Sequence, residues 1–176
     1  MYNCSTSPAA SRTSRLAPLP LTLMRLRRMY FCSSAGGSRG RLLDTKRSSR
    51  SILRLRYYLE APALRDLAAS HTPADLDTLR ALQRQAEEAP DTAALAQALF
   101  RYHRGVTFLS GNTITPLLFN AFMQVNLEFW SGYIRSVGRE ESLRTLARFT
   151  DLIAAGEGDR AAQLLDDGLR RFVTTL

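Results

Sequence analysis

The sequence predicts an all-α protein, built as an antiparallel bundle of about six helices. From residue 51 onward, apolar residues recur at spacings of three and four, which places them on one face of an α-helix. No stretch alternates apolar with polar residues, and no hairpin dipeptide joins two such stretches, so strands are not expected. A length of 176 residues suits one domain with a core better than two.

Residues 1–50 differ in composition from the rest of the chain. They are rich in Ser, Arg, Pro and Gly and show no sustained periodicity. We expect these residues to be disordered. Alternatively, they are not a natural protein product, for example because the start site was assigned too far upstream or the reading frame is shifted. The Arg-rich, acid-poor makeup also fits a transit peptide, although nothing after it looks organellar. The predicted organisation is a basic segment at 1–50 and a folded domain at 51–176.

The net positive charge of the chain lies in that first segment. The formal net charge is +8, and residues 1–50 hold ten Arg or Lys against one acid, which gives +9. Residues 51–176 hold fourteen Arg against fifteen Asp or Glu, which gives −1. The high net charge is therefore no argument that the folded part binds DNA.

The first two helices have clear local signals. The first spans about 51–69, and Pro62 is expected to bend it. The second begins at "HTPAD", where Thr72 is a natural N-cap, Pro73 occupies the first helical position and Asp75 completes a capping box.

Four further helices are predicted. The third begins after Asp91 as N-cap and carries an apolar seam of Leu95, Leu99, Tyr102, Val106 and Leu109. The fourth, about 114–136, is apolar on most sides and is predicted to be the central helix. The fifth covers about 140–155 and ends at Gly156, and the sixth continues from about residue 159 to the end of the chain.

The positions of the cysteines and the hydropathy of the sequence indicate the cellular location of the protein. Cys4 and Cys32 both lie in the basic segment, and their spacing fits neither a disulfide framework nor a metal knuckle. No apolar run approaches the roughly 18 residues that cross a bilayer. We expect a reducing, cytoplasmic location without a membrane span.

A resemblance to a known family rests on three stretches of the sequence and on their order: "LRLRYYLEAPALRDLAA", "FRYHRGVTFLSGN" and "LIAAGEGDRAAQLLDDGLRR". Together they resemble the FCD-type, effector-binding domain of the FadR subfamily of GntR bacterial transcription regulators. The likeness covers about 51–176. The residues that carry it are Arg56 with Leu59-Glu60, His103-Arg104 with Ser110-Gly111-Asn112, and Ala155-Gly156-Glu157 with Ala161. The middle stretch is most similar to fatty-acid-responsive members, except that Thr113 stands where proline is common.

The resemblance bears on metal binding. Many FCD domains hold a divalent metal with an Asp or Asn, a His one turn later, and two His on the last two helices. The corresponding positions here are Leu99, His103, about Leu146 and Gly168, so one donor of four remains. His71, the other histidine, lies in a turn and is not a substitute. A lone imidazole is a poor metal site, so we expect no metal and no cofactor.

Four residues are predicted to bind an effector: Arg56, His103, Asn120 and Trp130. Arg56 either pairs with an anionic effector through its planar fork or forms an ion pair with Glu60 one turn on. His103 either contacts the effector or is a buried histidine satisfied by a hydrogen bond. Trp130 belongs to an aromatic stripe that favours a core or dimer interface over a ligand cage. Asn120 needs a partner if it is buried.

The function that the resemblance implies is sensing of a small effector, an acyl-CoA or an organic acid, by a homodimeric transcription regulator. Such a regulator reads DNA through a winged helix-turn-helix, and residues 1–50 show no pattern for one, so specific operator binding is not expected. The alternative is a stand-alone helical interaction protein or a regulator remnant, with no ligand and no specific DNA binding. An enzyme is not expected, because the sequence has no nucleophile triad, phosphate loop or carboxylate pair.

Overall fold

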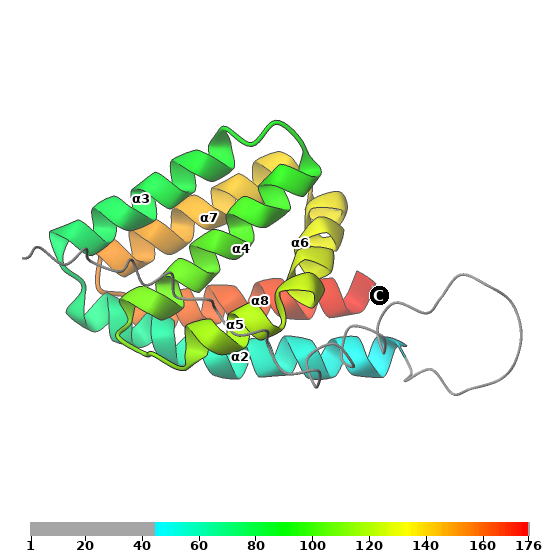
Figure 1. The fold of residues 1–176 in the computed structure, drawn as a ribbon, viewed down its shortest axis with the longest axis horizontal. Helices are drawn as coiled ribbons and strands as arrows, with labels where there is room; N and C mark the ends of the chain where they lie inside the picture. The colour runs from blue at the N-terminus through cyan, green and yellow to red at the C-terminus, as the bar shows by residue number, and fades with distance from the viewer. Residues whose placement is uncertain (1–44, 176) are drawn as a thin grey trace, which may run out of the picture. The chain divides into compact units, whose positions relative to one another are not determined.

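The computed structural model describes residues 45–175, and within them it contains helices and short connections without strands (Figure 1). The all-α prediction is therefore confirmed. The helices are α2 (Thr45–Ser70), α3 (Pro73–Glu87), α4 (Thr92–Leu109), α5 (Thr115–Ala121), α6 (Met123–Val137), α7 (Arg139–Ala154) and α8 (Gly158–Thr175). The expectations for residues 1–44, including both cysteines, lie outside the described part.

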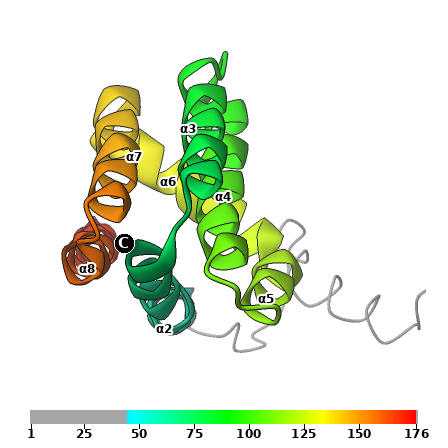
Figure 2. The ribbon, with the colours of Figure 1, turned by 90° about the vertical axis from the view of Figure 1, so that its left-hand side faces the viewer.

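The helices form a bundle around one apolar core. Helices α3, α4 and α7 run roughly parallel to one another as rods, and α2 and α8 lie side by side beneath them (Figures 1 and 2). Helix α6 packs on α4 and α7. Side chains at 0–1% exposure fill the space between: Leu64, Leu67, Leu79, Leu95, Leu99, Tyr102, Leu146 and Ile153. None of the described helices combines the length and the apolar content that a membrane crossing requires.

The predicted helix ends are confirmed at three places. The Thr72 hydroxyl accepts from the Asp75 backbone N–H and the Asp75 carboxylate accepts from the Thr72 backbone N–H, which is the full capping box of α3. Asp91 accepts from the Ala94 backbone N–H at 2.8 Å and caps α4. After α7, Gly156 has a φ of +74°, a conformation that favours glycine at a helix end.

Two predicted boundaries were wrong. Helix α2 begins at Thr45, not near residue 51, and it continues through Pro62 to Ser70. The helix predicted over 114–136 is two helices, because the chain turns at Phe122, where φ is −102° and ψ is 17°. Both helices pack on α4, and α6 also packs on α7.

Helices α2 and α8 lie close together at Gly158. A Cβ at this position would lie 2.7 Å from the Arg65 Cα and 3.2 Å from the Ala68 Cβ. We expect Gly158→Ala to lower the free energy of unfolding by about 1–3 kcal/mol, measured in urea, because backbone must move to admit the methyl group.

Gly168, further along α8, is the matched control. A Cβ there meets nothing within 4 Å. Gly168→Ala should therefore raise the free energy of unfolding by about 0.5–1 kcal/mol, the helix preference of Ala over Gly. Equal effects of the two substitutions would contradict a tight α2–α8 crossing.

Candidate functional site

Three of the four predicted effector residues meet inside the bundle. Arg56 comes from α2, His103 from α4 and Trp130 from α6, with exposures of 3%, 2% and 6%. Trp130 stacks on the His103 ring with centroids 4.7 Å apart and an interplanar angle of 25°. Each helix turns its apolar face inward, so these polar groups are carried into the core together with their apolar neighbours.

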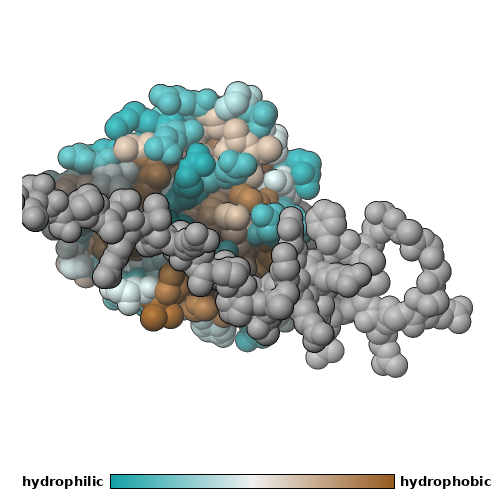
Figure 3. Space-filling view, viewed as in Figure 1, coloured by the Kyte–Doolittle hydropathy of each residue, from teal (hydrophilic) through white to brown (hydrophobic). Residues whose placement is uncertain are grey.

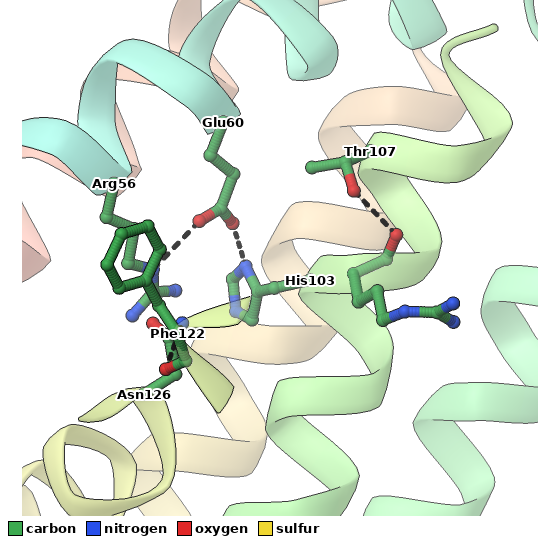
Figure 4. A network of polar contacts seen from close by, with 7 residues as sticks. Arg56, Glu60, His103, Thr107, Phe122 and Asn126 are labelled. Atoms are coloured by element: carbon green, nitrogen blue, oxygen red, sulfur yellow. Dashed lines mark hydrogen bonds and ion pairs between the residues drawn. The ribbon is translucent and has the colours of Figure 1, made fainter. Parts of the chain in front are cut away.

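Glu60 joins two of these residues and has no exposed surface. Its Oε2 accepts from the Arg56 Nε at 2.9 Å, and its Oε1 is hydrogen-bonded to the His103 Nδ1. Figure 4 shows the carboxylate reaching from α2 between the two side chains. The ion pair weighed as an alternative for Arg56 therefore forms, and His103 has the hydrogen-bond partner that a buried histidine requires.

The protonation states follow from this arrangement. Burial alone would raise the pKa of Glu60, but the charge of Arg56, the charge of His103 once it is protonated and the hydrogen bonds from both side chains together lower that pKa to about 2. Burial lowers the pKa of His103, and the Glu60 carboxylate opposes this effect only in part. At neutral pH the imidazole is then neutral and donates its Nδ1–H to Glu60. The single charges of Arg56 and Glu60 cancel.

Arg56 nevertheless keeps unused donors. Its Nη1 and Nη2 atoms are buried and have no hydrogen-bond partner among the described residues, and the same holds for Trp130 Nε1. The guanidinium carbon lies 4.1 Å from the Trp130 ring centroid and 4.8 Å from that of Phe129, which is cation–π geometry. A buried donor without a partner costs about 1–3 kcal/mol, so an acceptor placed against these atoms would be favoured.

Two small cavities adjoin Arg56. The first, of about 30 Å³, lies between α4, α6, α7 and α8, and its walls are mostly apolar and aromatic. They include Leu99, His103, Phe129, Trp130, Tyr133, Ser142, Thr145, Leu146, Phe149 and Gly168. The second, of about 20 Å³, lies toward α5 and the start of α6. A buried water needs roughly 10–15 Å³, so each of these spaces has room for about one or two waters.

The positions that correspond to the family's metal ligands converge on the first cavity. Leu99, His103, Leu146 and Gly168 all line it. Three of them carry no donor atom, and the Nδ1 of His103 is already bonded to Glu60. Among the described residues no group of three or more His, Cys, Asp or Glu is placed to hold a metal ion. These residues do not fit a divalent metal.

The fourth predicted residue lies elsewhere. Asn120 is exposed on α5, where its Oδ1 accepts from the Arg104 Nε at 2.7 Å. A different residue, Asn126 on α6, is 7% exposed and lines the second cavity. Its Nδ2 donates to the Phe122 carbonyl at 3.2 Å. Sequence reasoning missed Asn126 because the turn at Phe122 decides which asparagine faces inward.

The structure is thus a helical bundle that holds an arginine with open donors beside a small apolar cavity. A family model described as the FCD domain matches residues 51–171. The chain therefore belongs to the FCD domain family, the effector-binding domain of GntR-family transcription regulators. No match was found among curated proteins. Residues 45–175 contain no strand and hence no winged helix-turn-helix.

Proposed function

We propose that this chain is a sensing domain that binds a small organic anion without a metal. In a GntR-type regulator, binding of this anion to the domain would control the binding of the regulator to DNA. The observation that carries the proposal is the pair of unused Arg56 donors beside the cavity. Guanidinium groups bind carboxylates through two parallel hydrogen bonds, so a carboxylate is the group that these atoms select. Trp130 Nε1 offers a third donor to the same ligand.

The size of the cavities favours one of the two effector classes. At about 30 and 20 Å³ they are far below the roughly 300–1,000 Å³ of sites for large ligands. An acyl-CoA would require many core side chains to move, whereas a short organic acid requires fewer of them to move. We therefore favour a short carboxylic acid over an acyl-CoA as the effector.

Dimerisation is part of the proposal and rests on a separate observation. Several large apolar side chains near the end of α4, on α5 and at the start of α6 are 37–65% exposed: Phe108, Ile114, Leu117, Leu118 and Met123. Part of this apolar surface is visible in brown near α5, at the lower edge of the molecule in Figure 3. Exposed apolar patches mark interaction sites, and two copies of the chain would bury this one.

Ligand binding by Arg56 can be tested without unfolding the domain. We expect Arg56→Lys to weaken the binding of a responsive carboxylate about 10- to 100-fold, because lysine keeps the charge beside Glu60 but lacks the planar fork. Trp130→Phe should weaken it about fivefold, because the ring stays and only one donor is lost. Calorimetric titration with acetate, pyruvate, lactate and succinate measures both effects.

Arg104→Lys is the matched control, since Arg104 bonds to Asn120 and lines neither cavity. Native mass spectrometry of the purified chain would show the dimer mass and any acid that co-purifies. A monomer that releases no mass on unfolding and binds none of the acids would support the alternative, a helical interaction protein without a ligand.

A further inference from the structure

A surface groove between α2 and α8 is much larger than the cavities around Arg56. Its volume is about 740 Å³, within the range of small-molecule sites. Leu53 and Leu169, 5% and 6% exposed, contribute apolar surface to it. Leu169 also lines the first cavity beside Arg56, so the groove and the buried site share one wall residue.

The charged groups of the groove are unbalanced. Three guanidinium groups, those of Arg50, Arg54 and Arg170, face one carboxylate, that of Asp166. Arg170 uses this carboxylate, since its Nε donates to the Asp166 Oδ2 at 2.7 Å. No carboxylate of the described residues forms an ion pair with Arg50 or Arg54. The groove thus carries a net charge of about +2, by one charge per ionised side chain at neutral pH.

This arrangement is unfavourable for α2 by itself. Arg50 and Arg54 are both exposed and lie one turn apart on the same helix, where like charges repel. They also lie in the first half of α2, which has no acid in its first turn to complement the helix dipole. An anion held between the two guanidinium groups would offset this repulsion.

The same wall offers an aromatic surface. Tyr58 is 61% exposed, a high value for so large a side chain, and Tyr57 lies against its edge with ring centroids 6.0 Å apart. Both tyrosines line the groove with the arginines. Exposed aromatic rings beside guanidinium groups suit a ligand that joins a flat ring to a negative group, because the ring stacks while the anion pairs.

We propose that this groove is a second ligand site, distinct from the Arg56 cavity, and that it takes a nucleotide-sized anion such as a nucleoside diphosphate. The base would lie against Tyr58, and the phosphates between Arg50 and Arg54. The limited extent of the positive charge favours a small ligand over a nucleic acid strand. On α8, Asp166 and Asp167 lie next to Arg170, and the described residues 45–175 hold seventeen Arg or Lys against fifteen Asp or Glu, a net charge of only +2.

The test is a set of binding titrations on the full chain with ADP, inorganic pyrophosphate and a single-stranded DNA 12-mer, at physiological salt. We expect ADP to bind about fivefold or more tightly than pyrophosphate, since only ADP carries a ring. Arg54→Glu should weaken ADP binding about tenfold or more, and Tyr58→Ala about fivefold. Both side chains are exposed, so circular dichroism should show an unchanged fold.

Two controls make the result decisive. Arg101→Glu changes the same charge at an exposed position of α4 outside the groove and should leave ADP binding unchanged. Arg56→Lys should also leave it unchanged, which separates this proposal from that for the buried cavity. Equal binding of ADP and pyrophosphate, an equal loss in Arg101→Glu, or binding of DNA but not ADP would each overturn the proposal.

Discussion

Glu60→Gln should lower the free energy of unfolding by about 3–5 kcal/mol, one of the largest effects expected of any single substitution in this chain. The substitution keeps the shape of the side chain and leaves the Arg56 guanidinium, 3% exposed, without its counter-charge. A glutamine accepts from the Arg56 Nε, but an amide oxygen does not compensate a buried positive charge. Urea unfolding at pH 7.5, followed by circular dichroism, measures the loss.

The double variant Arg56→Met/Glu60→Gln is the control that isolates charge. It removes both charges from the core and retains similar volumes, and such replacements are often neutral or stabilising. We therefore expect the double variant to be more stable than Glu60→Gln alone. If it is equally unstable, the loss comes from the hydrogen bond to His103 or from packing, and the ion pair is not what holds α2 to the core.

This ion pair also explains why a sensing domain would tolerate such a costly arrangement. Glu60 occupies only one edge of the guanidinium, through Nε, so the charge is balanced while Nη1 and Nη2 stay available. A fully paired arginine would have nothing to offer a ligand, and an unpaired one would destabilise the core. Glu60 is therefore best understood as a positioning residue that holds both Arg56 and His103.

The sequence predicted those parts of the fold that local chemistry decides. Thr72 and Asp91 were recognised as helix caps because a capping residue acts within three positions of itself. The turn at Phe122 was not predicted, since no Gly or Pro marks it. Helices α5 and α6 both pack on α4 on either side of this turn, so the turn depends on the assembled bundle.

The candidate site could be predicted from the sequence only in part, as could the fold. Arg56 and His103 were singled out through the resemblance to the FCD domain and Trp130 through its aromatic stripe, and the structure brings the three together. The spacing of Arg56 and Glu60 allowed the ion pair but did not decide between it and an effector contact. That His103 bonds to the same carboxylate, 43 residues away along the chain, depends on the crossing of α2 and α4. Cavity size depends on side-chain packing, which periodicity does not report.

The stability of the domain should fall as the pH is lowered, in two steps with different origins. Burial lowers the pKa of His103 in the folded state below its ordinary 6.5, so below that pH the unfolded chain binds more protons and stability is lost. The pKa of Glu60 falls from 4.5 to about 2 on folding, so a second loss occurs between these values, on the order of 3 kcal/mol.

His103→Gln separates the two steps. Glutamine can still donate to Glu60 but does not titrate, so the variant should lose the upper step and retain the lower one. His71→Gln is the matched control, because His71 lies in the turn between α2 and α3, away from the cavity. Free energies of unfolding measured from pH 7.5 to pH 2.5 test this directly. Parallel profiles of the unmodified chain and His103→Gln above pH 5 would show that His103 does not enter the core as the neutral donor to Glu60.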